Sequence, residues 1–176
     1  MFNDGARHRK TQGTGGDVQG NRRTAGAGQE IFKAGFNCAE AVFLVVTRAF
    51  GLDVPEQVRL VTAFGGGVGR CREEMWGPWQ GACWPWGHCA DANSPEPAGP
   101  CGAAGSTVCE DALAAHGSIR CDDLLHVFGE QTDMQACLRF TAMVAGHVVA
   151  RLRQARDDGE LALSAIPPRT TGDAVA

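Results

Sequence analysis

The feature that most constrains this sequence is a helix start with a cysteine at its first position. Residues 35–42 read Gly-Phe-Asn-Cys-Ala-Glu-Ala-Val, and an apolar run continues from there to Phe50. Asn37 is a favoured N-cap residue, and Glu40 stands three positions later, which is the spacing of a capping box. The pattern therefore predicts a helix that begins at Cys38 and ends near Phe50.

Cys38 has two interpretations at this position. Free backbone N–H groups and the positive end of the helix dipole favour a thiolate at a helix N-terminus. On that basis we expect a lowered pKa and a reactive thiol. The alternative is a buried cysteine that only packs, because cysteine is among the most buried residue types.

The composition fits a single folded domain and argues against two classes of protein. The chain has 176 residues, of which 44% are hydrophobic, enough to bury a core. Its formal net charge of −4 gives no electrostatic basis for binding nucleic acid. No segment approaches the roughly 18 consecutive apolar residues of a membrane span. Residues 1–28 contain no apolar segment of the secretory type, so a cytoplasmic location is expected.

The cysteine content is high for a chain of this size. The eight cysteines are Cys38, Cys71, Cys83, Cys89, Cys101, Cys109, Cys121 and Cys137. In a cytoplasmic protein, cysteines are more often redox-active or metal-binding than structural. No two of them form a CxxC pair, and the group between residues 88 and 109 matches no standard zinc-ligand spacing.

No strand pattern occurs, so the fold class is predicted to be all-α, a bundle of about five to six helices. The expected helices cover residues 25–34, 38–50, 54–64, 106–116, 118–129 and 133–155. They form one domain, 25–156, and residues 88–105 are a proline- and glycine-rich loop insertion within it. Residues 1–24 are predicted to be a disordered, Gly- and Arg-rich tail, and residues 157–176 a flexible one.

Two further helix starts carry capping signals. Asp53 and Glu56 have the capping-box spacing, and Thr132 is expected to cap the last helix. That helix has a clear 3.6-residue apolar period, so one stripe of it should face the core. The stripe consists of Met134, Cys137, Leu138, Thr141, Val144, Ala145, Val148 and Leu152.

Two unusual stretches lie between these helices. Three consecutive glycines, Gly65, Gly66 and Gly67, permit positive φ and a close approach to another segment or to a ligand. Neither a P-loop nor a dinucleotide-binding pattern surrounds them, so a tight passage between helices is favoured over anion binding. Residues 75–87 hold all four tryptophans and two prolines, which predicts a short, distorted helix with aromatic core anchors.

Three of the cysteines share a setting. Cys38, Cys121 and Cys137 each fall in the first or second turn of a predicted helix. Thiols in such positions are expected to have the lowered pKa that exchange chemistry needs. Asp122 and Asp123 work against this at Cys121, so Cys38 is the preferred nucleophile.

Four parts of the chain, taken together, resemble the motifs of a known protein family: residues 35–42, 64–70 and 121–125, and Cys137. Together, the Asn-Cys-Ala turn, the Phe-Gly-Gly-Gly-Val-Gly-Arg loop and the two later cysteines resemble the C-GCAxxG-C-C family of redox-active proteins. The resemblance covers roughly residues 27–154. It implies a small helical domain with four motif cysteines and a thiol redox role.

The chain departs from the family at one motif. Where the family has Cys-Gly-Ala-x-x-Gly, residues 76–81 read Trp-Gly-Pro-Trp-Gln-Gly, so Trp76 stands at the cysteine position. Cys83 lies seven residues further on, on the same face of a regular helix, and Cys71 lies five residues before. Either thiol is a candidate for the fourth.

The sequence thus predicts a thiol redox protein with an unidentified redox partner. Cys38 would pair with Cys121 or Cys137, with Cys83 or Cys71 as an auxiliary thiol. A second interpretation uses Cys38, Cys71, Cys121 and Cys137 as thiolate ligands for a metal or an iron–sulfur cluster. In a third, the cysteines only pack.

The first interpretation makes a geometric prediction. The helices that begin near Cys38 and Cys137 should start at the same end of the bundle, so that their side chains meet Cys121 in one pocket. The glycine loop, residues 65–69, should close over that pocket. Cys89, Cys101 and Cys109 should lie elsewhere.

Overall fold

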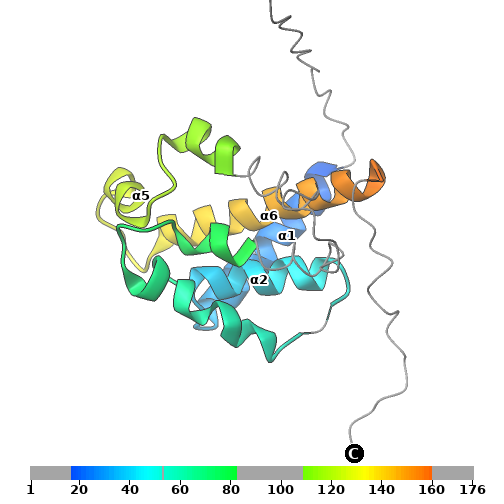
Figure 1. Cartoon of the computed structure of the whole chain (residues 1–176), viewed down its shortest axis with the longest axis horizontal. Helices are drawn as coiled ribbons and strands as arrows, with labels where there is room; N and C mark the ends of the chain where they lie inside the picture. The colour runs from blue at the N-terminus through cyan, green and yellow to red at the C-terminus, as the bar shows by residue number, and fades with distance from the viewer. Residues whose placement is uncertain (1–16, 53, 83–108, 160–176) are drawn as a thin grey trace, which may run out of the picture.

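The computed structural model describes residues 17–52, 54–82 and 109–159. Three long helices form its centre: α1 (Asp17–Lys33), α2 (Cys38–Ala49) and α6 (Gln135–Asp157). They pack against one another in all three pairs (Figure 1). Within the described ranges no strand forms, and an isolated antiparallel bridge joins Met75 to Arg120. The predicted all-α class is confirmed.

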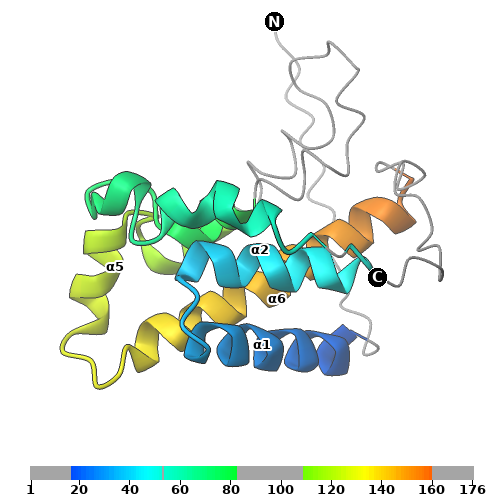
Figure 2. The same cartoon turned by 90° about the horizontal axis from the view of Figure 1, so that it is seen from below.

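Helix α2 lies at the centre of the bundle because it is apolar on nearly every side. Nine of its twelve residues are buried, more than a single apolar stripe would give. Helices α1 and α6 cover one side of it, and the 3₁₀ helix η1 (Gln57–Phe64) packs against it as well. Figure 2 shows the segment from η1 to residue 82 on the side of α2 that faces away from α1.

Helix α1 is longer than the sequence suggested. It begins at Asp17 rather than at residue 25, so part of the expected tail is helical. Gly28 is buried against α6, where an added Cβ would lie 3.4 Å from the Cα of Ala142. The glycine weakens the helix locally but lets the two backbones approach, and tertiary packing outweighs propensity.

Helix α6 has the predicted apolar stripe. Its members from Cys137 to Leu152 are buried, whereas Met134 is 47% exposed.

Among the described helices, none combines the length and the apolar character that a membrane crossing requires.

The third helix differs in kind from the prediction. Residues 57–64 form a 3₁₀ helix instead of an α-helix over 54–64, and Glu56 makes no side-chain capping bond. Val58 and Val61 are its buried residues, and a three-residue separation places both on one face of a 3₁₀ helix. Asp53, the other predicted capping residue, lies outside the described residues.

The tryptophan stretch supplies core residues, as predicted. Residues 77–82 are helical, and Trp76 and Trp79 are almost fully buried. Trp76 stacks on Phe140 of α6 with ring centroids 4.7 Å apart, and Trp79 meets the same ring edge-on at 6.3 Å. The remaining tryptophans, the predicted insertion 88–105 and Cys83, Cys89 and Cys101 lie outside the described residues.

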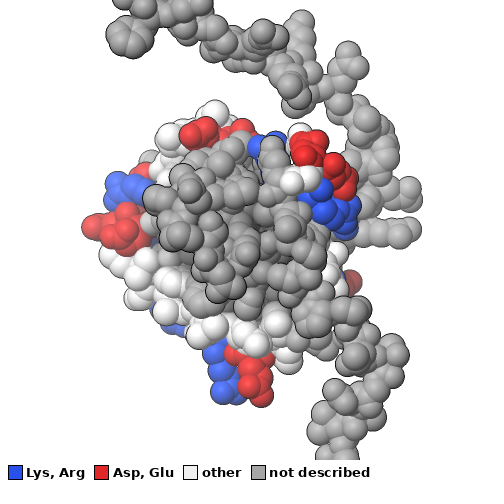
Figure 3. Space-filling model, turned by 45° about the vertical axis from the view of Figure 1, so that its right-hand side comes forward, with Lys and Arg blue, Asp and Glu red and all other residues white. Residues whose placement is uncertain are grey.

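Helix α5 (Cys121–Phe128) closes one end of the bundle, after a helical segment over residues 109–116. The helix ends at Gly129, whose φ of 67° favours glycine. Helices α2 and α6 both start at the end of the bundle where α5 lies (Figure 2), as predicted. Basic and acidic side chains lie in small mixed groups on the described surface that Figure 3 shows.

Candidate functional site

A cavity of about 240 Å³, which we call the thiol cavity, opens where the starts of α2, α5 and α6 meet the glycine loop. Its walls consist of Phe32, Asn37, Cys38, Gly65, Gly66, Arg70, Arg72, Trp76, Cys121, Leu125, Met134 and Cys137. The three cysteines are buried, free thiols. The structure therefore brings together the three cysteines, and part of the glycine loop, that the sequence indicated.

The capping box of α2 fixes Cys38 at the first helical position, as predicted. The Asn37 side chain accepts hydrogen bonds from the backbone N–H groups of Ala39 and Glu40, both at 3.0 Å. The Glu40 carboxylate accepts from the Asn37 backbone N–H at 2.8 Å. Asn37 and Glu40 also bond to Thr62, at 3.1 and 2.6 Å. The capping residues thus tie the start of α2 to η1.

The glycine loop lies directly against this helix start. A Cβ on Gly65 would lie 2.5 Å from the Asn37 side chain. Gly66 has a φ of 74°, and its backbone N–H favours the thiolate form of Cys38. Gly67 has a φ of 87° and is packed on the Cys71 carbonyl, although it does not line the cavity. The loop is a tight passage, and two of its three glycines also form cavity wall.

Two more glycines explain how the tryptophan stretch reaches α2. A Cβ on Gly77 would lie 3.0 Å from the Sγ of Cys38 and would collide with the Phe64 carbonyl. A Cβ on Gly81 would collide with the backbone of Ala39. These positions are four residues apart, on one face of a helical turn. Side chains at either one would push the turn off the start of α2.

The start of α5 is held by backbone bonds to the segment before the tryptophans. The N–H groups of Cys121 and Asp122 donate to the carbonyls of Glu74 and Arg72, at 3.1 and 2.8 Å. No side chain caps this helix. The first N–H groups of α5, which have no partner within the helix, are therefore already paired with these carbonyls. They give little support to a thiolate at Cys121.

The start of α6 is built differently from the prediction. Thr132 does not cap it, and the N-cap residue is Met134, with φ of 54° and no side-chain capping bond. Instead the Gln131 side chain accepts from the backbone N–H of Cys137 at 2.9 Å and donates to its Sγ at 3.6 Å. Gln131 therefore both satisfies a free helix N–H and solvates the sulfur.

The predicted lowering of the thiol pKa is wrong. Burial raises the pKa of Cys38 from 9.0 to about 11, and the N–H groups of Gly66 and Ala39 only partly oppose it. Burial also raises the pKa of Cys121 to about 11, and the neighbouring Cys38 and Cys137 add to the rise. The helix-start effect is outweighed because a thiolate loses its hydration in an apolar wall.

At Cys137 a side-chain donor and a cation oppose the effect of burial on the pKa. Burial raises its pKa, but the Gln131 side chain and the charge of Arg72 act in the opposite direction. Arg72 also lowers the pKa of Cys121. Cys38 has no such cation among the causes that set its pKa.

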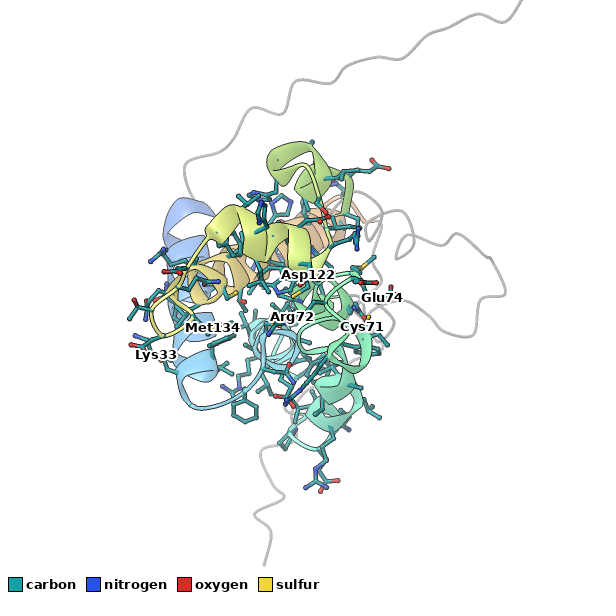
Figure 4. The ribbon with its side chains drawn as sticks, turned by 90° about the vertical axis from the view of Figure 1, so that its left-hand side faces the viewer. Lys33, Cys71, Arg72, Glu74, Asp122 and Met134 are labelled. Atoms are coloured by element: carbon teal, nitrogen blue, oxygen red, sulfur yellow. The ribbon has the colours of Figure 1, made fainter. Side chains whose placement is uncertain are left out.

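Arg72 is a site residue that the sequence did not reveal. In Figure 4 it lies below α5, between Met134 on one side and Cys71 on the other. A single arginine after a glycine loop carries no specific signal. Its role depends on the chain reversal at residues 71–76 that brings it beside α5.

The other predicted site residues do not join the cavity. Cys71 is exposed and is absent from the wall, so its expected place beside the other thiols is wrong. Cys109 lies apart as predicted, and Cys83 lies outside the described residues. Trp76, which stands where the resemblance places a cysteine, lines the cavity together with the three thiols. In the described part of the chain, no group of three or more His, Cys, Asp or Glu is arranged to hold a metal.

Comparisons with known proteins identify the family of this chain. Neither the curated proteins nor the solved structures contain a match to it. A family model described as "Putative redox-active protein (C_GCAxxG_C_C)" matches residues 36–150, well over half of the chain. The matched region contains the three cavity cysteines, the glycine loop and both glycines that pack on α2. The chain therefore belongs to the C_GCAxxG_C_C family.

Proposed function

We propose that this protein is a thiol–disulfide redox protein in which two of the three cavity thiols are oxidised to a disulfide. One observation carries the proposal: Cys38, Cys121 and Cys137 come from three helix starts and line one cavity as free thiols. The charge of Cys137 raises the pKa of Cys38, and those of Cys38 and Cys137 raise the pKa of Cys121. Cysteines that only pack have no need to share a cavity wall.

The reaction is an exchange with the disulfide of a redox partner. A cavity thiol loses its proton, and the thiolate attacks one partner sulfur, which releases the other as a thiol. A second cavity thiolate then attacks the mixed disulfide and releases the remaining partner sulfur. Two protein thiols become one disulfide, and the partner gains two electrons and two protons.

Cys137 is the first nucleophile in this proposal, in place of Cys38. Its sulfur accepts a hydrogen bond from Gln131, and the positive charge of Arg72 favours its thiolate. Cys38 or Cys121 then resolves the mixed disulfide.

The raised pKa values indicate the direction of electron flow. A thiol of high pKa is a poor leaving group, so the disulfide it forms resists reduction. Thiol–disulfide proteins that act as oxidants instead stabilise their thiolates, which makes their disulfides easy to reduce. The cavity thiols are therefore suited to reduce a partner rather than to oxidise one.

The test is a redox titration in dithiothreitol buffers, followed by tryptophan fluorescence, because Trp76 lines the same cavity as the three thiols. Wild-type protein should show one reversible two-electron transition. Cys137→Ser should abolish it, and Cys71→Ser, a change at an exposed thiol, should leave it unchanged. A transition that survives Cys137→Ser and disappears with Cys71→Ser contradicts the proposal. An absorption spectrum of anaerobically purified protein tests the metal alternative, since an iron–sulfur cluster absorbs in the visible range.

A further inference from the structure

We infer that the thiol cavity takes a small anionic disulfide, a low-molecular-weight disulfide that carries carboxylate groups, as its substrate. The inference rests on the proposed function and names the substrate class for the same site. Four properties carry it: the size of the cavity, the burial of its thiols, the charge at its mouth and its apolar walls.

The cavity is sized for a small molecule. Its volume of about 240 Å³ lies below the range of about 300–1,000 Å³ that is typical of pockets for drug-sized ligands. A compact aliphatic disulfide, or one half of a larger one, fits that space.

The thiols are too buried for a disulfide on a folded partner. The exposed fractions of Cys38, Cys121 and Cys137 are 7%, 3% and 3%. Thiol exchange requires the attacking sulfur to approach along the partner's S–S axis. A disulfide fixed in a protein surface cannot enter to that depth without unfolding one of the partners, whereas a small molecule can.

The cavity mouth carries an excess of positive charge. Arg70 and Arg72 are exposed and line the cavity, and neither forms an ion pair with a carboxylate among the described residues. Asp122 is the described carboxylate whose charge acts on a cavity thiol. The cavity wall contains these two guanidinium groups and no carboxylate, which favours an anionic ligand, and a guanidinium binds a carboxylate with two parallel hydrogen bonds. Lys33 lies on the same side of the molecule, and so do Asp122 and Glu74 (Figure 4).

The walls between the arginines and the sulfurs are apolar. Phe32, Trp76 and Leu125 line the cavity together with the thiols. The methylene groups of a short aliphatic disulfide would lie against these side chains, with the S–S bond near the buried sulfurs and a carboxylate at the mouth. Apolar walls with few polar groups at defined points are typical of small-molecule sites.

The exchange consumes one small disulfide and releases two small thiols. The Cys137 thiolate attacks one sulfur of the anionic disulfide and releases one small thiol, leaving a mixed disulfide. A second cavity thiolate attacks the Cys137 sulfur and releases the other small thiol. The protein ends with one intramolecular disulfide, and a dithiol reductant returns it to the starting state.

The experiment compares three aliphatic disulfides of similar size on the full-length reduced protein. They are 3,3′-dithiodipropionate, which is anionic, 2-hydroxyethyl disulfide, which is neutral, and cystamine, which is cationic. Rates of loss of the cavity thiols are measured by quenching and mass spectrometry. Each rate is divided by the rate of the same probe with 2-mercaptoethanol, so that differences in intrinsic reactivity cancel.

At low salt the anionic probe should react about tenfold faster than the cationic one after this correction, with the neutral probe between them. Arg70→Gln combined with Arg72→Gln should reduce the ratio to about 1–2. Arg59→Gln, at an exposed arginine of η1 outside the cavity wall, should leave it unchanged. The single variant Arg72→Lys should retain much of the preference for the anionic probe, since it keeps the positive charge. High salt should weaken the preference, because exposed charges are screened.

Two kinds of failure are distinguishable. Equal corrected rates for the three probes, or a faster reaction with an oxidised thioredoxin-type protein, overturn the substrate class but leave the cavity thiols redox-active. If no probe oxidises a cavity thiol, while exposed Cys71 reacts, the proposed function itself is wrong.

Discussion

The side-chain amide of Gln131 bridges the backbone and the sulfur of Cys137, accepting from the N–H at 2.9 Å and donating to Sγ at 3.6 Å. A single residue outside the helix thus replaces a conventional N-cap and supports a thiolate.

Gln131→Ala should raise the pKa of Cys137 further, because the sulfur loses its hydrogen-bond donor. It should also destabilise the fold by about 1 kcal/mol, since a helix N–H loses its cap. The measurement is the pH dependence of alkylation at Cys137, followed by mass spectrometry. Gln135→Ala, at an exposed position of α6, is the matched control. An unchanged Cys137 profile in Gln131→Ala would show that the bridge has no effect on the thiol.

The raised pKa of Cys38 predicts a loss of stability in alkali. The folded protein keeps the proton up to about pH 11, whereas an unfolded thiol releases it near pH 9. Between these values the unfolded state binds fewer protons, so the free energy of unfolding falls as pH rises. The two-unit difference corresponds to about 2–3 kcal/mol for this thiol at most.

Urea denaturation at pH 8 and at pH 10.5 measures this effect. Wild-type protein should lose more stability between the two pH values than Cys38→Ala does. If both lose the same amount, the alkaline loss has another origin.

Gly77→Ala and Gly26→Ala should have opposite effects on stability. The methyl group at residue 77 would meet the Phe64 carbonyl and the Cys38 sulfur, so we expect a loss of about 1–3 kcal/mol. An added Cβ at Gly26 in α1 meets nothing within 4 Å, and alanine there should gain about 0.5–1 kcal/mol. Thermal and denaturant unfolding give both values. A neutral Gly77→Ala would contradict the close packing of residues 77–82 on α2.

Arg70 has a φ of 63°, a conformation that favours glycine. Arg70→Gly should therefore stabilise the fold slightly, by about 0.5–1 kcal/mol, while it slows oxidation by 3,3′-dithiodipropionate. The strained backbone conformation of Arg70 is then explained by its positive charge, which that conformation places at the cavity mouth. Denaturant unfolding and the probe assay test the two halves, and a destabilised Arg70→Gly would remove this explanation.

The sequence was most informative where a local pattern determines the structure. The capping box of Asn37 and Glu40 is complete within four residues, so the start of α2 could be predicted. The apolar period of α6 predicted its buried face in the same way. The helix starts then sufficed to bring Cys38, Cys121 and Cys137 to one cavity.

The errors arose where distant segments decide the outcome. The sign of the Cys38 pKa shift depends on burial by other elements, which a helix-start argument does not contain. Cys71 is exposed and Arg72 lines the cavity because of the chain reversal at residues 71–76, and no local pattern marks that difference. Gln131 caps α6 from four residues before the helix, outside the usual capping spacing.

The most direct test of the account is to map the disulfide that forms in the oxidised protein. Reduced protein is oxidised with 3,3′-dithiodipropionate, remaining thiols are blocked, and the peptides are identified by mass spectrometry without reduction. We expect a bond from Cys137 to Cys38 or Cys121, with Cys71 and Cys109 still free. Oxidation confined to Cys71 or Cys109, with all three cavity thiols recovered as free thiols, would contradict it.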